Sequence, residues 1–214
     1  MNERGDNMAM RPGYTIVGGK VVTVNANFEW SGGFAISQKQ KNITKLHQAL
    51  GGSALEVSTK STVELGRKLS AFNLRLEGHT LENIFQSSKT FENGGPYTDL
   101  LYVHPKEAKH DPRLRESGRL IAFKNKGESW PLEPKTVFYD YIYAMAVKEC
   151  ISKEELEKLG EYKYFTDIEF NPAKSVNTQA RAIAIVKLLY EMYGEIPELN
   201  KEDFIRFHRS VVTY

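Results

Sequence analysis

The segment YTIVGGKVVTV, residues 14–24, constrains the fold of this chain more than any other stretch. Two runs of β-branched residues flank Gly18-Gly19, and two adjacent glycines between such runs are typical of the tight turn of a β-hairpin. An all-helical fold is therefore excluded, and we expect a β-hairpin near the N-terminus.

Helical patterns dominate the rest of the chain. Apolar residues recur at helical spacing over 36–50, and Gly51-Gly52 follows as a stop signal. Longer patterns predict helices over 133–150 and 175–193. The combination predicts an α+β fold that is mostly helical, with a small β component and the hairpin as an N-terminal extension.

Length and charge limit the class of protein. The chain has 214 residues, and 29 Lys and Arg against 27 Asp and Glu give a net charge of +2. That length suits one domain, and the charge excludes a polycation that holds nucleic acid by bulk attraction alone. No apolar run approaches the ~18 residues of a membrane span, and the first residues lack the apolar region of a signal peptide.

The residues that bind metals in proteins are sparse. Cys150 is the single cysteine, and the five histidines show no metal-ligand spacing. We therefore expect a cytoplasmic protein that makes no membrane contact and needs neither a metal nor another cofactor.

The stretch over 69–97 is the most informative for function. If 80–91 is helical, Glu82, Gln86 and Lys89 share one face of that helix. One interpretation is a solvated polar face, which is common on helices. The other is a functional face, which is favoured by Phe72-Asn73 just upstream and by a Gly-Gly-Pro loop just downstream.

These residues resemble a known signature. Leu69-Ser70-Ala71-Phe72 followed by Glu82, Phe85-Gln86 and Lys89 resembles the signature of the NADAR superfamily, in which a helix carries Glu-His-x-x-Gln-x-x-Lys. Asn83 stands where most members carry the histidine. The similarity spans roughly 54–193 and is greatest to the NADAR antitoxins paired with DarT-type toxins. Tyr164 to Asp167, with Asn177 and Ala180, is similar to the close of that domain.

The resemblance implies a fold and an activity. It implies a NADAR-like catalytic domain over 54–214, with residues 1–53 as an extension packed on it. It further implies an N-glycosidic hydrolase that removes ADP-ribose from guanine bases in DNA and so acts as antitoxin to a DarT-type ADP-ribosyltransferase. ADP-ribosylated DNA, ADP-ribose and the toxin itself are the partners that follow.

Three residues are the catalytic candidates. Breaking a glycosidic bond builds positive charge on the sugar and negative charge on the leaving base. Glu82 is the first choice for polarising the ribose or activating water. Asp167 is a second carboxylate or, alternatively, a turn or helix cap. Lys89 is an electrostatic group, an acid, or a nucleophile that forms a Schiff base, and the last role needs a lowered pKa.

Other residues are candidates for binding. We expect six residues with amide, aromatic or basic side chains to bind substrate: Phe72, Asn73, Gln86, Trp130, Asn177 and Arg181. For Phe72 and Trp130 the alternative is a place in the core. Lys39 and Lys41 are candidate nucleic-acid contacts, and the alternative for them is a solvated face.

Two other functions are compatible with the same residues. One is an N-glycosidase of a small phosphoribosylamine-type or ADP-ribose-like metabolite. The other is a non-enzymatic protein that binds the toxin or ADP-ribose.

Overall fold

A four-stranded sheet forms one side of the molecule. The structure is a computed structural model that describes residues 7–173 and 175–213. The strand order is β2-β1-β9-β3, and the bounds are β1 Met8–Val17, β2 Lys20–Glu29, β3 Ala54–Glu56 and β9 Tyr164–Thr166. β1 is antiparallel to β2 and β9, whereas β3 is parallel to β9. The parallel pair places Glu56 beside Thr166 at one edge of the sheet.

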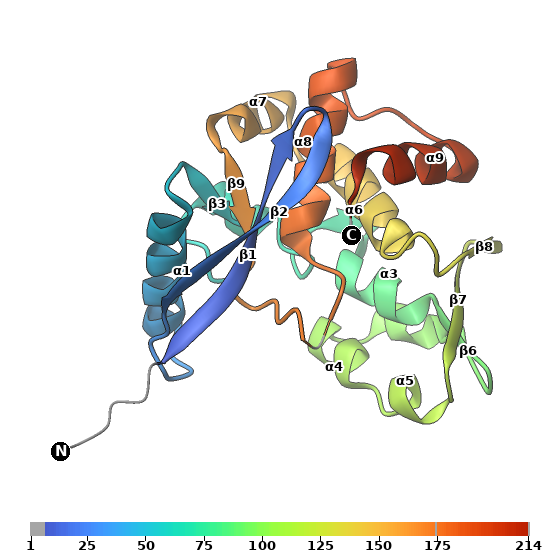
Figure 1. Ribbon diagram of the computed structural model, residues 1–214. Coiled ribbons are helices and arrows are strands. Elements are labelled where there is room, and N and C mark those ends of the chain that lie inside the picture. The colour runs from blue at the N-terminus through green and yellow to red at the C-terminus, as the bar shows by residue number, and fades with distance from the viewer. Residues whose placement is uncertain (1–6, 174, 214) are drawn as a thin grey trace.

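Four long helices surround this sheet. α6 (Val137–Cys150) and α8 (Gln179–Tyr193) pack on each other at the centre, and α9 (Lys201–Val211) lies against α6 (Figure 1). α1 (Ile36–Leu50) lies beside the hairpin, where apolar side chains of both form a second, smaller hydrophobic cluster. In the described part of the chain, no helix is long and apolar enough to cross a membrane.

Short elements fill the other side of the molecule. β6, β7 and β8 form an antiparallel sheet in that order, and β4 pairs with β5. The remaining bounds are α2 Glu64–Lys68, β4 Arg75–Leu76, β5 His79–Thr80, α3 Leu81–Ser87, β6 Lys89–Phe91, η1 Thr98–Tyr102, α4 Pro105–His110, α5 Arg113–Glu116, β7 Leu120–Asn125, β8 Glu128–Trp130, α7 Lys153–Glu157 and η2 Lys158–Glu161.

The α+β class and the hairpin are confirmed. The turn of the β1–β2 hairpin is at Gly18-Gly19, and both glycines have a positive φ. α1 ends at Gly51 and α8 ends at Gly194, each glycine in the left-handed conformation that favours this residue. α8 begins at Gln179 rather than at 175, because the Thr178 hydroxyl caps it by accepting from the Ala180 N–H.

The helix predicted over 80–91 is wrong in its second half. α3 ends at Ser87, and Lys89 is the first residue of β6, paired with Phe123 of β7. The Ser88 carbonyl accepts a hydrogen bond from the Lys124 N–H at 2.7 Å. Pairing with a strand distant in the sequence therefore overrides the local helical pattern, and Lys89 does not share a helix face with Glu82 and Gln86.

The predicted extension, residues 1–53, shares the four-stranded sheet with the predicted catalytic domain over 54–214. Gly13 and Tyr14 of β1 pair with Thr166 and Phe165 of β9. Residues 1–6 of the predicted extension lie outside the described residues. The division into 1–53 and 54–214 stays a prediction.

Candidate active site

The short helix α3 is buried on every side. All seven of its residues are buried, including the polar residues Glu82, Asn83 and Gln86. Gln86 Nε2 donates to Glu82 Oε1 at 2.9 Å, and the two residues are 5% and 6% exposed. Gln86 Oε1 is buried and has no hydrogen-bond partner among the described residues. Because burying a carboxylate and an unsatisfied amide is unfavourable, such a pair indicates a site rather than a packing role.

Asn83 has a different role from its neighbours on α3. Its Nδ2 donates to the carbonyls of Leu100 at 2.6 Å and Val103 at 2.9 Å. Its backbone N–H and its side-chain oxygen both bond the Thr80 hydroxyl, which caps the helix. The residue that replaces the usual histidine therefore ties α3 to η1, and its amide is fully occupied.

Lys89 extends from the start of β6 over an aromatic ring. Its Nζ lies 4.9 Å from the centroid of Phe85, which follows Glu82 by one turn of α3. Desolvation lowers the pKa of Lys89 to about 8, although the negative charge of Glu82 acts in the opposite direction. The positive charge of Lys109 lowers this pKa further. With a pKa near 8, about one tenth of the amine is neutral at pH 7.

Asp167 follows β9 directly and is 6% exposed. Its Oδ2 accepts from Gln179 Nε2 at 3.0 Å and its Oδ1 accepts from the Glu169 N–H at 3.1 Å. Burial raises the pKa of Asp167, while these two hydrogen bonds lower it. The Oδ1 bond closes a local turn, as in the alternative considered for this residue.

Glu56 is a buried carboxylate that the sequence reasoning missed. It accepts from the hydroxyls of Ser58 at 2.7 Å and Thr166 at 2.6 Å, and from the Ile168 N–H at 2.8 Å. Burial raises the pKa of Glu56 to about 7, with a further contribution from the charge of Asp167. In the sequence, the available signal is a glutamate between the apolar residues Leu55 and Val57.

Phe72 and Lys109 lie together beside these groups. Lys109 Nζ is 5.4 Å from the centroid of the Phe72 ring, and α4 places this lysine at the surface. The charge of Lys109 lowers the pKa of both Lys89 and Asp167. Asn73, by contrast, is exposed and donates to the Arg67 carbonyl at 2.8 Å.

Electrostatic effects link the catalytic candidates in pairs. The charge of Glu82 acts on the pKa of Lys89, and the charges of Glu82 and Asp167 both raise the pKa of the buried Tyr139, after desolvation. We name Glu82, Gln86, Lys89 and Asp167 together the buried polar wall. Carboxylates and an amine of lowered pKa are the groups that acid–base and nucleophilic catalysis require.

Arg181 belongs to a buried network of hydrogen bonds and ion pairs around Asp140. Its guanidinium donates to the Val176 carbonyl at 2.9 Å, and its Nε lies 3.7 Å from Asp140 Oδ2. His208 of α9 and Thr136 contact the same Asp140 oxygen at 2.9 and 2.7 Å. These contacts hold the connection before α8 in place, whereas a contact of Arg181 with substrate stays a prediction.

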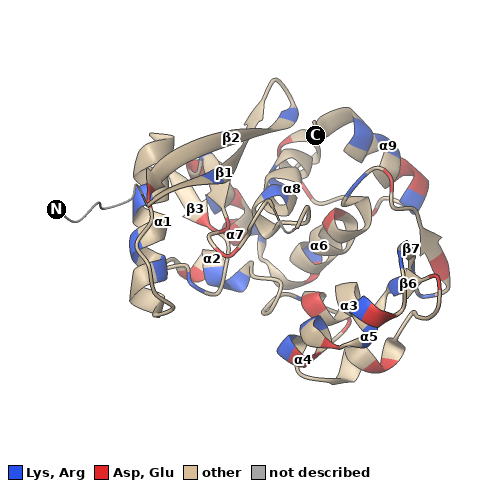
Figure 2. Cartoon of the chain, turned by 60° about the horizontal axis from the view of Figure 1, so that its bottom comes forward, with Lys and Arg blue, Asp and Glu red and all other residues tan. Residues whose placement is uncertain are grey.

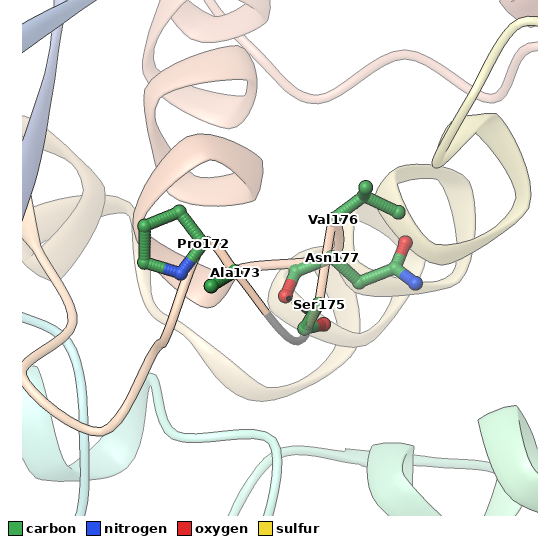
Figure 3. Close-up of a pocket in the computed structure, with 5 residues that line it drawn as sticks. All are labelled: Pro172, Ala173, Ser175, Val176 and Asn177. Atoms are coloured by element: carbon green, nitrogen blue, oxygen red, sulfur yellow. Dashed lines mark hydrogen bonds between the residues drawn. The ribbon is translucent and has the colours of Figure 1, made fainter.

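Asn177 lies in that connection, on a concave part of the surface. This pocket is lined by Pro172, Ala173, Ser175, Val176 and Asn177. The Asn177 amide extends to the side opposite Pro172 (Figure 3), and its Oδ1 is buried without a hydrogen-bond partner among the described residues. An unoccupied acceptor beside a pocket is compatible with the predicted binding role.

Trp130 lies apart from the wall. It is 1% exposed, and its ring centroid is 5.6 Å from Phe138 and 4.5 Å from Tyr141. In the three-stranded sheet Phe123 stands between Lys89 and Trp130. This burial favours the alternative of a core residue.

The two lysines of α1 differ in their surroundings. Lys39 Nζ forms an ion pair with Glu169 at 3.2 Å and lies 5.5 Å from the Trp30 ring. Lys41 is exposed. Figure 2 shows basic residues on α1 and on α4 rather than one continuous positive face.

The chain matches a known protein family over almost its whole length. Residues 9–213 match NADAR-DarT1, the family described as DarT1-associated NADAR antitoxin. The match includes the hairpin, which the resemblance over 54–193 did not. The chain has no match among curated proteins.

Proposed function

The chain belongs to the family of DarT1-associated NADAR antitoxins, and from that premise we propose that it hydrolyses the bond between ADP-ribose and a guanine base of DNA. The proposed reaction consumes water and releases ADP-ribose and the unmodified base. By this reaction the protein would reverse the modification made by the associated toxin.

One observation carries the proposal most directly. Lys89, whose pKa is lowered, begins the strand that follows the buried helix α3; the charge of the buried Glu82 acts on it, and the charge of Lys109 acts on both Lys89 and the buried Asp167. A lysine whose only role is to bind a phosphate acts in its protonated form, which exposure to solvent favours. The burial of Lys89 instead increases the neutral amine, which is the nucleophilic form.

We assign the first step to acid catalysis by Asp167. Its raised pKa favours a protonated carboxyl that gives its proton to the ribose ring oxygen. The bond between C1 and the ring oxygen breaks, and the lone pair of the guanine nitrogen forms a C=N bond with C1. This step converts C1 into an electrophile while ADP-ribose stays attached to the base.

We assign the second step to Lys89. The neutral Nζ adds to C1, and the proton that it loses passes to Glu82, whose charge already acts on Lys89. The guanine nitrogen then leaves with the electron pair of its bond to C1 and takes that proton. A protonated Schiff base between Lys89 and the opened ribose remains.

Hydrolysis of the Schiff base completes the reaction. Water adds to C1 and gives a proton to a carboxylate of the wall. The C1 hydroxyl then gives its proton to Nζ, and the bond between C1 and Nζ breaks with its electron pair going to nitrogen, which releases ADP-ribose as the aldehyde and restores the neutral amine. Gln86, which has a free acceptor, is assigned to a ribose hydroxyl, and Lys109 with Phe72 to the pyrophosphate and a stacked ring.

The test is release of ADP-ribose from an oligonucleotide that carries ADP-ribosylated guanine. Wild-type protein should release it, and Lys89→Ala and Glu82→Ala should not, while both variants keep the wild-type unfolding temperature to within a few degrees. Turnover of only a phosphoribosylamine would assign the metabolite function instead. Rescue of toxin-expressing cells by Lys89→Ala would assign a binding function.

A further inference from the structure

Trp30 at the end of the hairpin lies between two cations. Arg11 Cζ of β1 is 5.0 Å and Lys39 Nζ of α1 is 5.5 Å from the centroid of the indole ring. Trp30 packs at the margin of the smaller hydrophobic cluster and stays partly exposed. β1 and α1 thus each bring one positive charge close to the indole ring that follows β2.

Phe34 lies four residues after Trp30 and is 100% exposed. It follows Ser31-Gly32-Gly33 in the loop between β2 and α1, and the start of that loop is anchored. The Ser31 N–H donates to the buried Asn42 Oδ1 at 2.7 Å, and Asn42 Nδ2 donates to the Ser31 carbonyl at 2.9 Å. The loop is thus held at its start, and the whole Phe34 ring is available for contact with a partner.

This surface continues into the candidate active site. Lys39 pairs with Glu169 at 3.2 Å, and the Glu169 N–H donates to Asp167 at 3.1 Å. Ile168, between those two acidic residues, packs in the cluster that Trp30 covers. In Figure 1 the start of α1 and the connection from β9 to α8 both lie on the lower side of the molecule. A strand that leaves the wall past Asp167 therefore reaches Lys39 and Trp30.

We propose that Arg11, Trp30, Phe34 and Lys39, the N-terminal platform, bind single-stranded DNA beside the modified guanine. The inference rests on the proposed function and names the form of its substrate. Bases of a single strand can stack on Trp30 and Phe34 whatever their sequence, whereas bases of a duplex are already stacked. Arg11 and Lys39 supply phosphate contacts locally, as a net charge of +2 requires.

Binding of unmodified DNA tests the platform without any hydrolysis. The probe is a fluorescent single strand of about 12 nucleotides. Trp30→Ala and Phe34→Ala should each weaken binding by about five-fold or more, since aromatic stacking on a base is a strong contact. Lys39→Gln should reduce the slope of log affinity against log salt by about 0.7.

One matched control lies at the far end of the hairpin and another on α8. Lys20, the first residue of β2, stands ten positions from Trp30, about 33 Å away. Lys20→Gln and Tyr193→Ala, the latter at the exposed end of α8, should leave binding unchanged. Phe34 is fully exposed, so that its variant keeps the fold even if Trp30→Ala loosens the smaller cluster. Equal affinity of platform variants and wild type, or equal affinity for duplex and single strand, would overturn the inference.

A second arm separates this inference from the proposed function. Platform variants should raise KM for a modified single-stranded oligonucleotide by about five-fold and leave turnover of ADP-ribosylated guanosine unchanged. If wild type hydrolysed neither substrate, the proposed function would fail, while the binding measurement would still decide on the platform. An unchanged KM on the oligonucleotide, with hydrolysis intact, would overturn the platform alone.

Discussion

The buried polar wall and the N-terminal platform place similar groups in opposite surroundings. Each has an amine over an aromatic ring: Lys89 lies 4.9 Å from Phe85, and Lys39 lies 5.5 Å from Trp30. Lys89 is desolvated and meets a buried carboxylate, whereas Lys39 pairs with the exposed Glu169.

This difference in burial indicates that the buried polar wall and the N-terminal platform have different roles. In the wall, burial changes the pKa of Lys89 and Asp167, which suits proton transfer and bond making. On the platform, Phe34 is fully exposed and Arg11, Trp30 and Lys39 are partly exposed, which suits contacts with a polymer. Changes in the wall should therefore act on kcat, and changes on the platform on KM.

The largest effect should come from Lys89→Arg. Arginine keeps the positive charge but supplies no neutral amine near neutral pH. We expect kcat to fall by about 10⁴-fold or more, as for loss of a nucleophile. Steady-state release of ADP-ribose measures it, with Lys39→Arg as the matched change on the platform. If Lys89→Arg kept more than a tenth of the activity, the lysine would act by charge, and the distinction between the regions would weaken.

Glu82→Gln should have the next largest effect. Glutamine keeps the shape and can still accept from Gln86 Nε2, but it cannot take a proton. We expect kcat to fall by about 10²- to 10⁴-fold, the usual contribution of acid–base catalysis. The same assay on Glu161→Gln, an exposed carboxylate at the end of η2, should show an unchanged kcat. Equal losses in the two variants would contradict the assignment of Glu82.

The pH profile should show the ionisation of Lys89. If neutral Lys89 and protonated Asp167 react together, kcat/KM should be level just below pH 8 and fall as pH increases through about 8, the pKa of Lys89 set by desolvation, because the protonated fraction of Asp167 still declines there while Lys89 is already neutral. Lys109→Gln removes a positive charge that lowers the pKa of Lys89, so that the fall should move to higher pH. Lys106→Gln, a matched change on α4, should leave the profile in place. A profile that did not move in Lys109→Gln would argue against Lys89 as the titrating group.

The smallest effect should be on stability, at Glu56. Burial raises the pKa of Glu56 in the folded state to about 7, above its unfolded value. The stability that the protonated carboxyl contributes is therefore fully present below the unfolded pKa and is lost as pH rises through about 7. Glu56→Gln should remove about 2 kcal/mol of that pH dependence between pH 5 and 8, as urea unfolding would measure. Parallel curves for wild type and variant would contradict a raised pKa.

Much of the fold follows from local sequence signals. The hairpin turn at Gly18-Gly19 and the ends of α1 and α8 depend on glycine conformations that neighbours in sequence determine. The end of α3 does not. Its last turn gives way to β6 because β7, more than 30 residues away, supplies hydrogen-bond partners for Lys89 to Phe91. Pairing at that distance leaves no trace in a helical pattern.

The candidate site was predictable by residue type more than by geometry. Glu82, Gln86 and Asp167 were candidates by residue type and are buried polar side chains in the fold, whereas Lys89 lies on a strand and not on the predicted helix. Glu56 was not a candidate, because a single glutamate between two apolar residues has no helical spacing. Of the two tryptophans, Trp130 was the candidate for substrate binding and Trp30 was not. Trp130 is buried against Phe138 and Tyr141. Which indole lies between two cations depends on the packing of hairpin and α1, which neither segment encodes alone.

Chemical trapping tests the central claim most directly. Wild-type protein is mixed with an oligonucleotide that carries ADP-ribosylated guanine, reduced with borohydride during turnover, digested, and analysed by mass spectrometry. A Schiff base on Lys89 predicts a reduced ADP-ribosyl adduct on the peptide that contains this lysine, and its absence from Lys89→Arg. Full turnover with no adduct on Lys89, or with the adduct on another lysine, would contradict the claim.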